Sequence, residues 1–258
     1  MARHHHAKPA GVPTWTDLMT TDTEKARMFY HAVFGWEYHV AGPEFGGYIN
    51  AHINEHMVAG ITGPMPGAPP MPAAWTIYFA SHDIDADVAK AEKLGAKVMA
   101  PAMTVGDLGK MAILIDPTGA VFGLWQAGTF TGAMVTEEHG AMNWVELAST
   151  DAKAANSFYV GLLGTTSAAM PGGLEYYTLS HGEHQRAGIM QADPAWGIKQ
   201  SFWVNYFHTD DAAATAALAV KNGATLRGPI DDTPFGHLGE LVDPVGANFK
   251  IIQPPKHS

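Results

Sequence analysis

Cysteine is absent from this 258-residue chain, and so is any apolar run long enough to cross a membrane as a helix. Without cysteine there are no disulfides, no thiol nucleophile and no thiolate metal ligands. A spanning helix needs about 20 consecutive apolar residues. The first residues also lack the apolar segment of a secretory signal peptide. We therefore expect a soluble, cytoplasmic protein with no membrane partner.

Basic residues are scarce: 15 Lys and Arg stand against 25 Asp and Glu, giving a formal net charge of −10. Such a field repels a phosphate backbone, and no basic cluster offsets it, so the sequence predicts no nucleic-acid partner. A P-loop, a dinucleotide-binding glycine fingerprint and a Gly-x-Ser-x-Gly elbow are all missing. The sequence thus gives no support for a nucleotide cofactor or acyl-serine chemistry, and we expect no cofactor.

What the chain does contain is an internal repeat. The 47% hydrophobic content and the length are typical of two globular domains. Matching signposts recur at an offset that falls only from 129 to 127, as in Trp15 with Trp144, Asp83 with Asp211, and Asp116 with Asp243. So small a drift means that each half is a complete structural unit. The predicted organisation is a flexible tail (1–11), a first domain (12–127), a linker (128–140) and a second domain (141–254).

Each half reads as a strand, a helix and three short strands, and this order occurs twice per half. In the first module, Thr21 and Glu24 form a capping-box pattern at the helix start, and Gly35 marks its end. The strands are short and rich in hairpin turns, such as the one from Asp116 to Gly119. This pattern is typical of an α+β fold of four βαβββ modules, not of a doubly wound parallel sheet.

Two motifs carry a resemblance that covers nearly the whole chain. Each domain ends with a hairpin containing Asp-Pro-x-Gly, and each opening helix ends in Phe-Tyr followed by glycine. With four βαβββ modules, the chain resembles the vicinal oxygen chelate superfamily, which includes glyoxalases, extradiol dioxygenases and bleomycin-resistance proteins. The segments VPTWTDLMTTD, GPMPGAPPMP and DPTGAVFGLWQA also resemble the tandem-domain group of the mycobacterial 27 kDa antigen. That resemblance implies two tandem glyoxalase-like domains with clefts on their sheets.

The resemblance also implies where metal ligands would stand. Metal-using members carry His or Gln on a module's opening strand, seven residues before the Asp of the next helix. They carry Glu on the closing strand, seven residues after the Asp of Asp-Pro-x-Gly. Here the corresponding residues are Trp15, Thr76, Trp144 and Val204 on opening strands, and Gly123 and Lys250 on closing strands. None of these is a good ligand for a divalent ion, and we predict no metal site.

Alternation along a strand indicates what lies in the clefts instead. Trp15 shares its face with Asp17, and Trp144 shares its face with Glu146, because residues two apart point the same way. The two carboxylates are candidate catalytic residues, either as general bases or as orienting groups. The alternative is that these tryptophans are core and the acids are hydrogen-bonded at the cleft floor. The candidate ligand-binding residues are all aromatic: Trp15, Tyr48, Trp75, Trp125, Trp144, Tyr177 and Trp203.

Three functions remain open from the sequence. The first is a metal-independent protein of the glyoxalase and bleomycin-resistance type that binds a small organic molecule, such as an antibiotic or a reactive metabolite, in aromatic clefts. A methionine-rich crossover around Met65 and Met71 favours an adaptable apolar cavity. The second is a glyoxalase-like lyase or isomerase, or an accessory factor in secondary-metabolite oxidation, using Asp17 or Glu146 as base. The third is a structural protein whose clefts are filled by their own tryptophans. We expect a monomer or homodimer.

Overall fold

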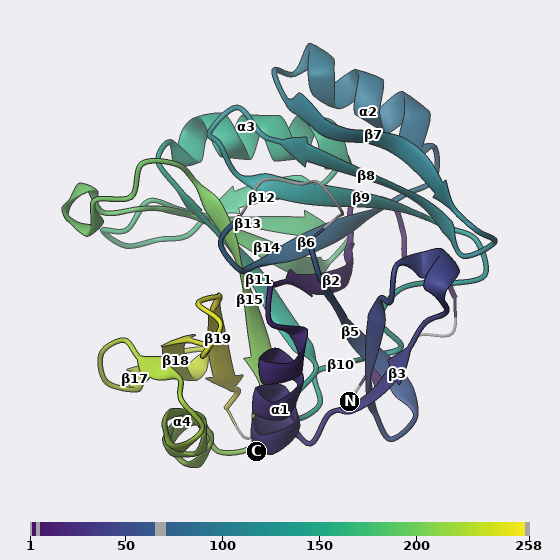
Figure 1. Ribbon diagram of the computed structural model, residues 1–258. Helices are drawn as coiled ribbons and strands as arrows, with labels where there is room; N and C mark the ends of the chain where they lie inside the picture. The colour runs from purple at the N-terminus through teal and green to yellow at the C-terminus, as the bar shows by residue number, and fades with distance from the viewer. Residues whose placement is uncertain (1, 4–5, 65–70, 256–258) are drawn as a thin grey trace.

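Each half of the chain builds one large mixed sheet, as the computed structural model shows for residues 2–3, 6–64 and 71–255 (Figure 1). The first sheet has the strand order β3-β4-β5-β2-β6-β9-β8-β7, and the second has β12-β13-β14-β11-β15-β19-β18-β16, with β17 paired to β18. In both, the opening strands of two modules lie antiparallel at the centre of the sheet. The expected α+β fold, with two tandem domains of βαβββ modules, is confirmed.

The elements of the first half follow the expected order of strand, helix and three strands, twice over. They are β1 (Ala2–Arg3), β2 (Pro13–Met19), α1 (Thr23–Phe34), β3 (Glu37–Val40), η1 (Pro43–Phe45), β4 (Ile49–Ile53), β5 (His56–Thr62), β6 (Ala74–Ser81), α2 (Ile84–Lys93), β7 (Lys97–Val105), β8 (Gly109–Ile115) and β9 (Val121–Ala127).

The second half repeats this order after a short strand in the connecting segment. Its elements are β10 (Val135–Thr136), β11 (Met142–Ser149), α3 (Ala152–Leu163), β12 (Thr166–Ala169), β13 (Tyr176–His181), β14 (His184–Gln191), η2 (Pro194–Trp196), β15 (Phe202–His208), α4 (Ala212–Lys221), β16 (Thr225–Leu226), β17 (Asp231–Thr233), β18 (Gly236–Val242) and β19 (Asn248–Gln253).

All four α-helices begin at an aspartate. The side chain of Asp22 accepts a hydrogen bond from the Lys25 amide, and the aspartates that open α2, α3 and α4 make the same bond three residues on. This bond satisfies an amide that the first turn leaves without a helical partner. The expectation that Thr21 begins α1 is therefore wrong by one residue. Gly35 ends α1 in the left-handed conformation (φ 70°), as its spacing predicted.

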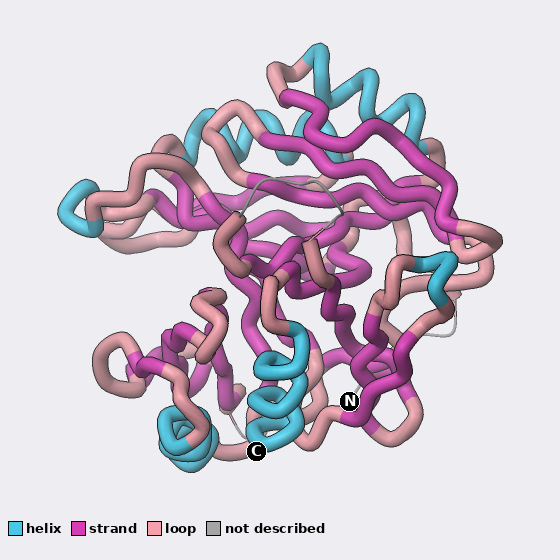
Figure 2. The backbone as a smooth tube through the Cα atoms, in the orientation of Figure 1, coloured by secondary structure: helices cyan, strands magenta, loops and turns pink. Residues whose placement is uncertain are grey.

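The two largest hydrophobic cores lie between the halves. Helix α1 packs beside α4, and α2 packs beside α3, so each core receives residues from both sheets (Figure 1). In the first core, Phe29 and Phe34 of α1 meet Phe207 and Phe249 of the second half. The helices lie outside the strands in the tube view (Figure 2). Each helix thus covers one face of its own sheet while contacting the other half.

Two hydrogen-bonded chains tie the halves together through these cores. The indole of Trp75 donates to the Tyr30 hydroxyl (3.1 Å), which donates to the Asp243 carboxylate of the other half (2.8 Å). The counterpart chain runs from Trp203 to Tyr159 (2.8 Å) and on to Asp116 (2.9 Å). The two tyrosines are fully buried. The repeated Trp, Phe-Tyr and Asp-Pro signposts of the sequence are therefore the parts of these two ties.

The segments before and between the domains take part in the fold. Strand β1 pairs with β10, and Lys8 is buried and donates to the Pro13 carbonyl (3.2 Å). Gly11 donates its amide to the carbonyl of Ala80 in β6. The structure thus gives the residues expected to form a flexible tail defined contacts with the rest of the chain. Of the helices in the described part of the chain, none is long and apolar enough to cross a membrane.

The ties between the halves predict how a single hydroxyl contributes to stability. Removing it in Tyr159→Phe leaves the Trp203 indole and one Asp116 oxygen without this buried partner, which costs about 1 to 3 kcal/mol of unfolding free energy. Tyr177→Phe is the matched control, because its hydroxyl bonds only to exposed Glu175. Its effect should stay within about 0.5 kcal/mol. Urea denaturation of both variants measures the difference, and equal losses would contradict the role assigned to Tyr159.

Candidate functional site

The face of each sheet opposite the helices carries a matched row of side chains on its three central strands. In the first sheet, Trp15 lies opposite Tyr78, which lies opposite Gly123. In the second, the row is Trp144, Tyr206 and Lys250. The two rows differ at one position only, glycine against lysine. This difference decides the electrostatics of each site.

The first site is built around the Asp17 carboxylate. One oxygen of this buried group accepts hydrogen bonds from the hydroxyls of Tyr78 (3.0 Å) and Tyr48 (3.2 Å). The indole of Trp15 donates to the Tyr48 hydroxyl (2.8 Å). A side chain on Gly60 would collide with the ring and hydroxyl of Tyr48, so glycine is needed there. Trp15 and Asp17, which the sequence placed together, do belong to one group.

Burial raises the pKa of Asp17 to about 6, because the ionised carboxylate loses its hydration there. The hydrogen bonds from Tyr78 and Tyr48 act in the opposite direction, since they favour the charged form. Gly123 occupies the register position at which the second site has its lysine. A side chain at position 123 would collide with the Tyr78 ring. The packing of that ring thus excludes a cation from the closing strand.

Apolar residues cover the first site. The ring of Phe130, from the segment after β9, meets Trp15 edge-on at 4.8 Å and Trp125 at 5.5 Å. The Trp125 indole also donates to the Phe130 carbonyl (2.9 Å), which holds the covering segment in place. Methionine and aliphatic side chains, Met57, Met111, Val105, Leu108 and Ile113, pack around the group. Trp15 is left only 4% exposed.

The second site has the same core with an added cation. Glu146 accepts hydrogen bonds from Tyr176 on Oε2 (3.0 Å) and from Tyr206 on Oε1 (2.8 Å). The Lys250 ammonium lies 3.1 Å from Glu146 Oε1 and 3.0 Å from the Tyr206 hydroxyl. It also lies over the Tyr206 ring, 5.0 Å from its centre. Trp144 completes the group by donating to Tyr176 (3.3 Å).

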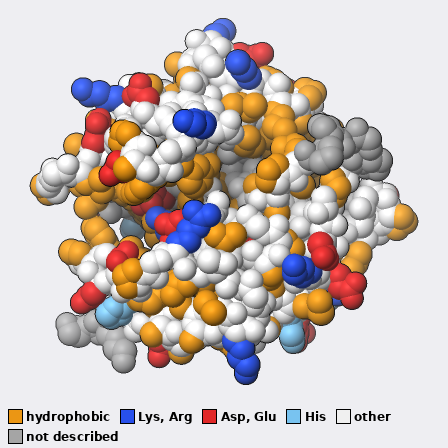
Figure 3. Space-filling view, turned by 60° about the vertical axis from the view of Figure 1, so that its left-hand side comes forward, with side chains coloured by type: hydrophobic (Ala, Val, Ile, Leu, Met, Phe, Trp, Pro, Cys, Tyr) orange, Lys and Arg blue, Asp and Glu red, His pale blue; other side chains and the backbone are white. Residues whose placement is uncertain are grey.

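Exposure distinguishes the second site from the first. Trp144, Tyr176 and Lys250 are each partly exposed, and only Val204, Tyr206 and Ile252 of the surrounding apolar cluster are buried. The space-filling view shows a hollow near the centre of the molecule in which basic and acidic side chains lie next to each other (Figure 3). The tryptophan is therefore more exposed in the second group than in the first, whereas the two acids are equally buried, at 7% for Asp17 and 6% for Glu146.

Several expected ligand-binding residues lie elsewhere. Trp75 and Trp203 face the helices and are the indoles of the two ties, so they line no cleft. Tyr177 was matched to Tyr48, but Tyr176 makes the equivalent bonds, and Tyr177 points to the opposite face of β13. The error arose because the repeat offset changes between the two hairpins. Met65 lies outside the described residues, and Met71 is exposed.

The sequence reasoning missed the tyrosine partners of both acids. Tyr78 and Tyr206 recur at an offset of 128, but the repeat does not show that they lie next to Asp17 and Glu146. The sequence does indicate which face of the sheet they occupy. Tyr78 is three residues after Trp75 on the same strand, so the two side chains point to opposite faces of the sheet. Strand register, which places Trp15 opposite Tyr78, supplied the missing information. From the sequence, Lys250 is predicted only to be a poor metal ligand. Its ion pair with Glu146 depends on the folded structure.

The donor sets in the two rows do not fit the metal that the resemblance implies. Tryptophan and glycine offer no ligand atom at all, and the Lys250 ammonium repels a cation. Within the described ranges, no group of three or more His, Asp or Glu side chains is placed to hold a metal ion. No step of a mechanism is therefore assigned to a metal in either row.

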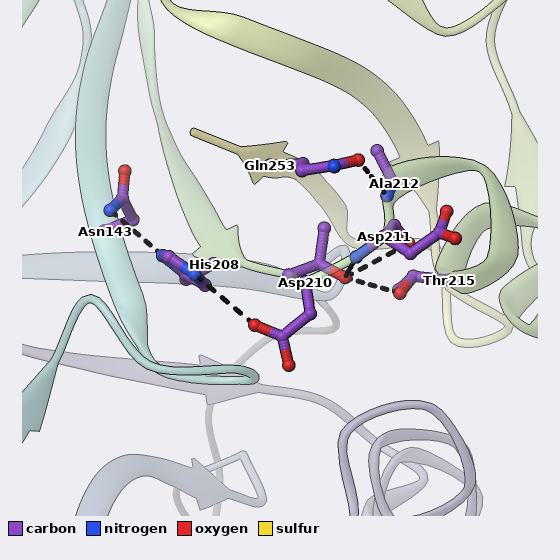
Figure 4. A network of polar contacts seen from close by, with 8 residues as sticks. Asn143, His208, Asp210, Asp211, Ala212, Thr215 and Gln253 are labelled. Carbon is purple, nitrogen blue, oxygen red and sulfur yellow. Dashed lines mark hydrogen bonds and ion pairs between the residues drawn. The ribbon is translucent and has the colours of Figure 1, made fainter. Parts of the chain in front are cut away.

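Histidine is also found outside the two rows, in a network at the start of α4 (Figure 4). His208 lies 3.5 Å from the Asn143 amide nitrogen and 3.9 Å from Asp210. Desolvation lowers its pKa from the ordinary value. Next to it, the Thr209 hydroxyl contacts Thr215, and Gln253 accepts from the Ala212 amide. These bonds shape the helix start, so the network is structural.

The fold agrees with the comparisons. The model of the Glyoxalase/Bleomycin resistance protein/Dioxygenase superfamily matches residues 12–124 and 141–251, so this chain belongs to that superfamily.

Individual relatives extend the comparison over nearly the full chain. The protein is 40% identical to the putative glyoxylase CFP32 of Mycobacterium tuberculosis over 95% of both chains. It is 34% identical to the anthracycline biosynthesis protein DnrV of Streptomyces peucetius, covering 94% of this chain and 93% of that one. Its fold is similar to the 2,3-dioxygenase LapB from Pseudomonas sp. KL28, with a TM-score of 0.68 and 15% identity over 97% of this chain and 95% of that one.

The covered carboxylate predicts a pH dependence of stability. The pKa of Asp17 is raised on folding from 3.8 to about 6, so the folded state binds its proton more tightly than the unfolded state does. Burying the ionised group therefore costs nothing below pH 4 and about 3 kcal/mol above pH 6. Asp17→Asn removes this cost while keeping an acceptor for Tyr78 and Tyr48. Its stability relative to the parent protein should rise by up to about 3 kcal/mol between pH 4 and pH 7.

Chemical denaturation across this pH range measures the effect. Asp107→Asn, at an exposed position on the same half, controls for the loss of one negative charge. A parallel pH dependence for Asp17→Asn and the parent protein would show that Asp17 ionises normally in the folded state.

Proposed function

We propose that this protein binds a small organic molecule, without a metal, at the site around Trp144 and Glu146. The observation that supports this most is the unequal exposure of two equivalent groups. Phe130 covers Trp15 of the first group, whereas Trp144 of the second keeps exposed surface. The sequence predicts an aromatic cleft in each half, whereas this proposal assigns ligand binding to the second half alone. In the covered first half, the core-like alternative describes the packing better.

The chemistry of the exposed group fits an organic ligand. Trp144 and Tyr176 offer flat apolar surface with polar edges, and Phe202 and Leu238 extend this surface. Glu146 and Lys250 add one acceptor and one donor at the base of the site. A mostly apolar wall with few polar groups is usual for sites that bind small molecules.

The names of the relatives are consistent with such a ligand. One is named a putative glyoxylase and another an anthracycline biosynthesis protein. Anthracyclines contain a planar fused-ring system, which suits a site walled by indole and phenol rings. We therefore propose a planar aromatic natural product or metabolite as the ligand class.

A thermal-shift screen with planar aromatic compounds tests this proposal. A ligand that binds only the folded state increases the free energy of unfolding by about 2.7 kcal/mol at a hundredfold excess over Kd. The unfolding temperature rises as a result. We expect stabilisation of the parent protein by part of the panel, and its loss in Trp144→Ala. Trp196→Ala is the control, since Trp196 is 56% exposed and lies outside the site.

Two additions make the screen decisive. A chelator should leave the shifts unchanged, because no metal takes part in binding. If no planar aromatic compound stabilises the parent protein, or if Trp144→Ala retains the full shift, then ligand binding at this site is refuted.

A second candidate function is catalysis by the carboxylates, as a glyoxalase-like lyase or isomerase or as an accessory factor in secondary-metabolite oxidation. Two observations favour it. The pKa of Asp17, raised to about 6, lies close to the range in which a general base works, and Glu146 lies in the partly exposed group. Asp17 and Glu146 are equally buried, but Trp144 and Lys250 next to Glu146 are partly exposed, which makes Glu146 the better candidate base.

Turnover of a methylglyoxal–thiol adduct separates catalysis from binding alone. If Glu146 is the base, Glu146→Gln should lower kcat by about a hundredfold or more, whereas Asp17→Asn should lower it much less. Absence of turnover in the parent protein, or equal turnover in all three proteins, excludes this mechanism while leaving ligand binding untouched.

A further inference from the structure

Of the two matched groups, only the second has a charged donor next to its carboxylate, the ammonium group of Lys250. The side chains of Lys250 and Glu146 are 17% and 8% exposed, so the pair is shielded yet reachable. Lys250 contacts Glu146 Oε1 and the Tyr206 hydroxyl, and Tyr176 contacts Glu146 Oε2. The pair is therefore fixed from three sides by strands β11, β15 and β13.

Counting hydrogen-bonding capacity shows what the pair still offers. An ammonium group has three donors, and two of them point to Glu146 and Tyr206 in the described structure. Each carboxylate oxygen accepts about two bonds. Oε1 already receives Tyr206 and Lys250, while Oε2 receives Tyr176. One lysine donor and one acceptor position on Oε2 remain for a ligand.

The first half shows that this pair is not required by the fold. Its row ends in Gly123, and Asp17 is held by Tyr78 and Tyr48 without a cation. The sheet thus forms equally well without the lysine. Within the covered site, Asp17 offers only an acceptor. The donor next to an acceptor is specific to the exposed site, which indicates a role in recognising a ligand.

Resting on the proposed function, we propose that the second site selects an aromatic hydroxyketone, a planar ring carrying a hydroxyl next to a carbonyl group. The hydroxyl donates to Glu146, and the carbonyl oxygen accepts from Lys250. Hydrogen bonds to charged partners are the stronger kind, so both bonds contribute to affinity and to orientation. The ring itself lies against Trp144. The ion pair thereby holds adjacent ligand oxygens with protein groups alone.

A matched pair of probes tests this selection. A dihydroxyanthraquinone, whose hydroxyls flank a carbonyl, is compared with its dimethyl ether, which keeps the ring and the carbonyls but donates no hydrogen bond. Absorbance titration gives both dissociation constants. In the parent protein, the dihydroxy compound should bind roughly tenfold more tightly or better, since a hydrogen bond to a charged group is at stake.

The double variant E146Q/K250M removes the selecting groups without leaving a buried charge unpaired. Glutamine has one acceptor oxygen where glutamate has two, and it carries no charge, so the ligand hydroxyl loses its charged acceptor. The preference between the two probes should fall to within about threefold, and both probes should bind more weakly than to the parent protein, because the carbonyl oxygen of each loses its bond from Lys250. Lys110→Met, which removes an exposed lysine paired with Asp85, is the control and should keep the preference.

The outcomes separate this inference from the proposed function. Equal binding of both probes by the parent protein, or a preference that persists in E146Q/K250M, overturns the inference and leaves ligand binding in place. If neither probe binds the parent protein, the inference is overturned, and the proposed function is then decided by the thermal-shift screen with the full panel of planar compounds. Thermal unfolding of each variant checks that it is folded, and Glu146→Gln alone serves as a second variant should the double one fail to fold. In it, the preference should be reduced.

Discussion

The two chains of hydrogen bonds from tryptophan through tyrosine to aspartate hold this protein together as one unit. Each chain starts on a sheet and ends in a turn of the other half, at Asp243 or Asp116. A buried tyrosine hydroxyl is the middle member of each and serves as both donor and acceptor. Because a buried carboxylate and a buried indole both need partners, the halves are held in one arrangement and not merely packed. The shared cores beneath the helices follow from that arrangement.

These ties also determine which sheet face is free. Once Trp75, Trp203 and the helices cover one face, the alternation of strands leaves the opposite face for Trp15 with Tyr78 and for Trp144 with Tyr206. This face thus carries an indole, a phenol and a closing-strand residue in one row in both halves. The site chemistry then depends on that last residue. Glycine at position 123 accommodates the Tyr78 ring, whereas lysine at position 250 gives Glu146 a cation.

Duplication followed by divergence at a few positions accounts for two unlike sites on one scaffold. The pKa of Asp17 is raised because burial without a cation disfavours its charge, and Phe130 deepens that burial. Glu146 has Lys250 beside it, and Trp144 keeps exposed surface. One half thus has an acid without a cation beneath a buried tryptophan, and the other has an acid paired with lysine beside a partly exposed tryptophan. The repeat thereby supplies its own internal comparison for every residue of the site.

The sequence by itself determined the α+β class, the two tandem domains, the helix ends and the pairing of a tryptophan with a carboxylate on each opening strand. These features depend on local periodicity, on turn residues and on the repeat, all of which are visible along the chain. Tertiary structure alone decided that Trp75 and Trp203 join the ties, that Tyr176 and not Tyr177 reaches Glu146, and that Lys250 pairs with it. Those contacts depend on strand register and on packing between halves, because both bring together residues that are far apart in the sequence.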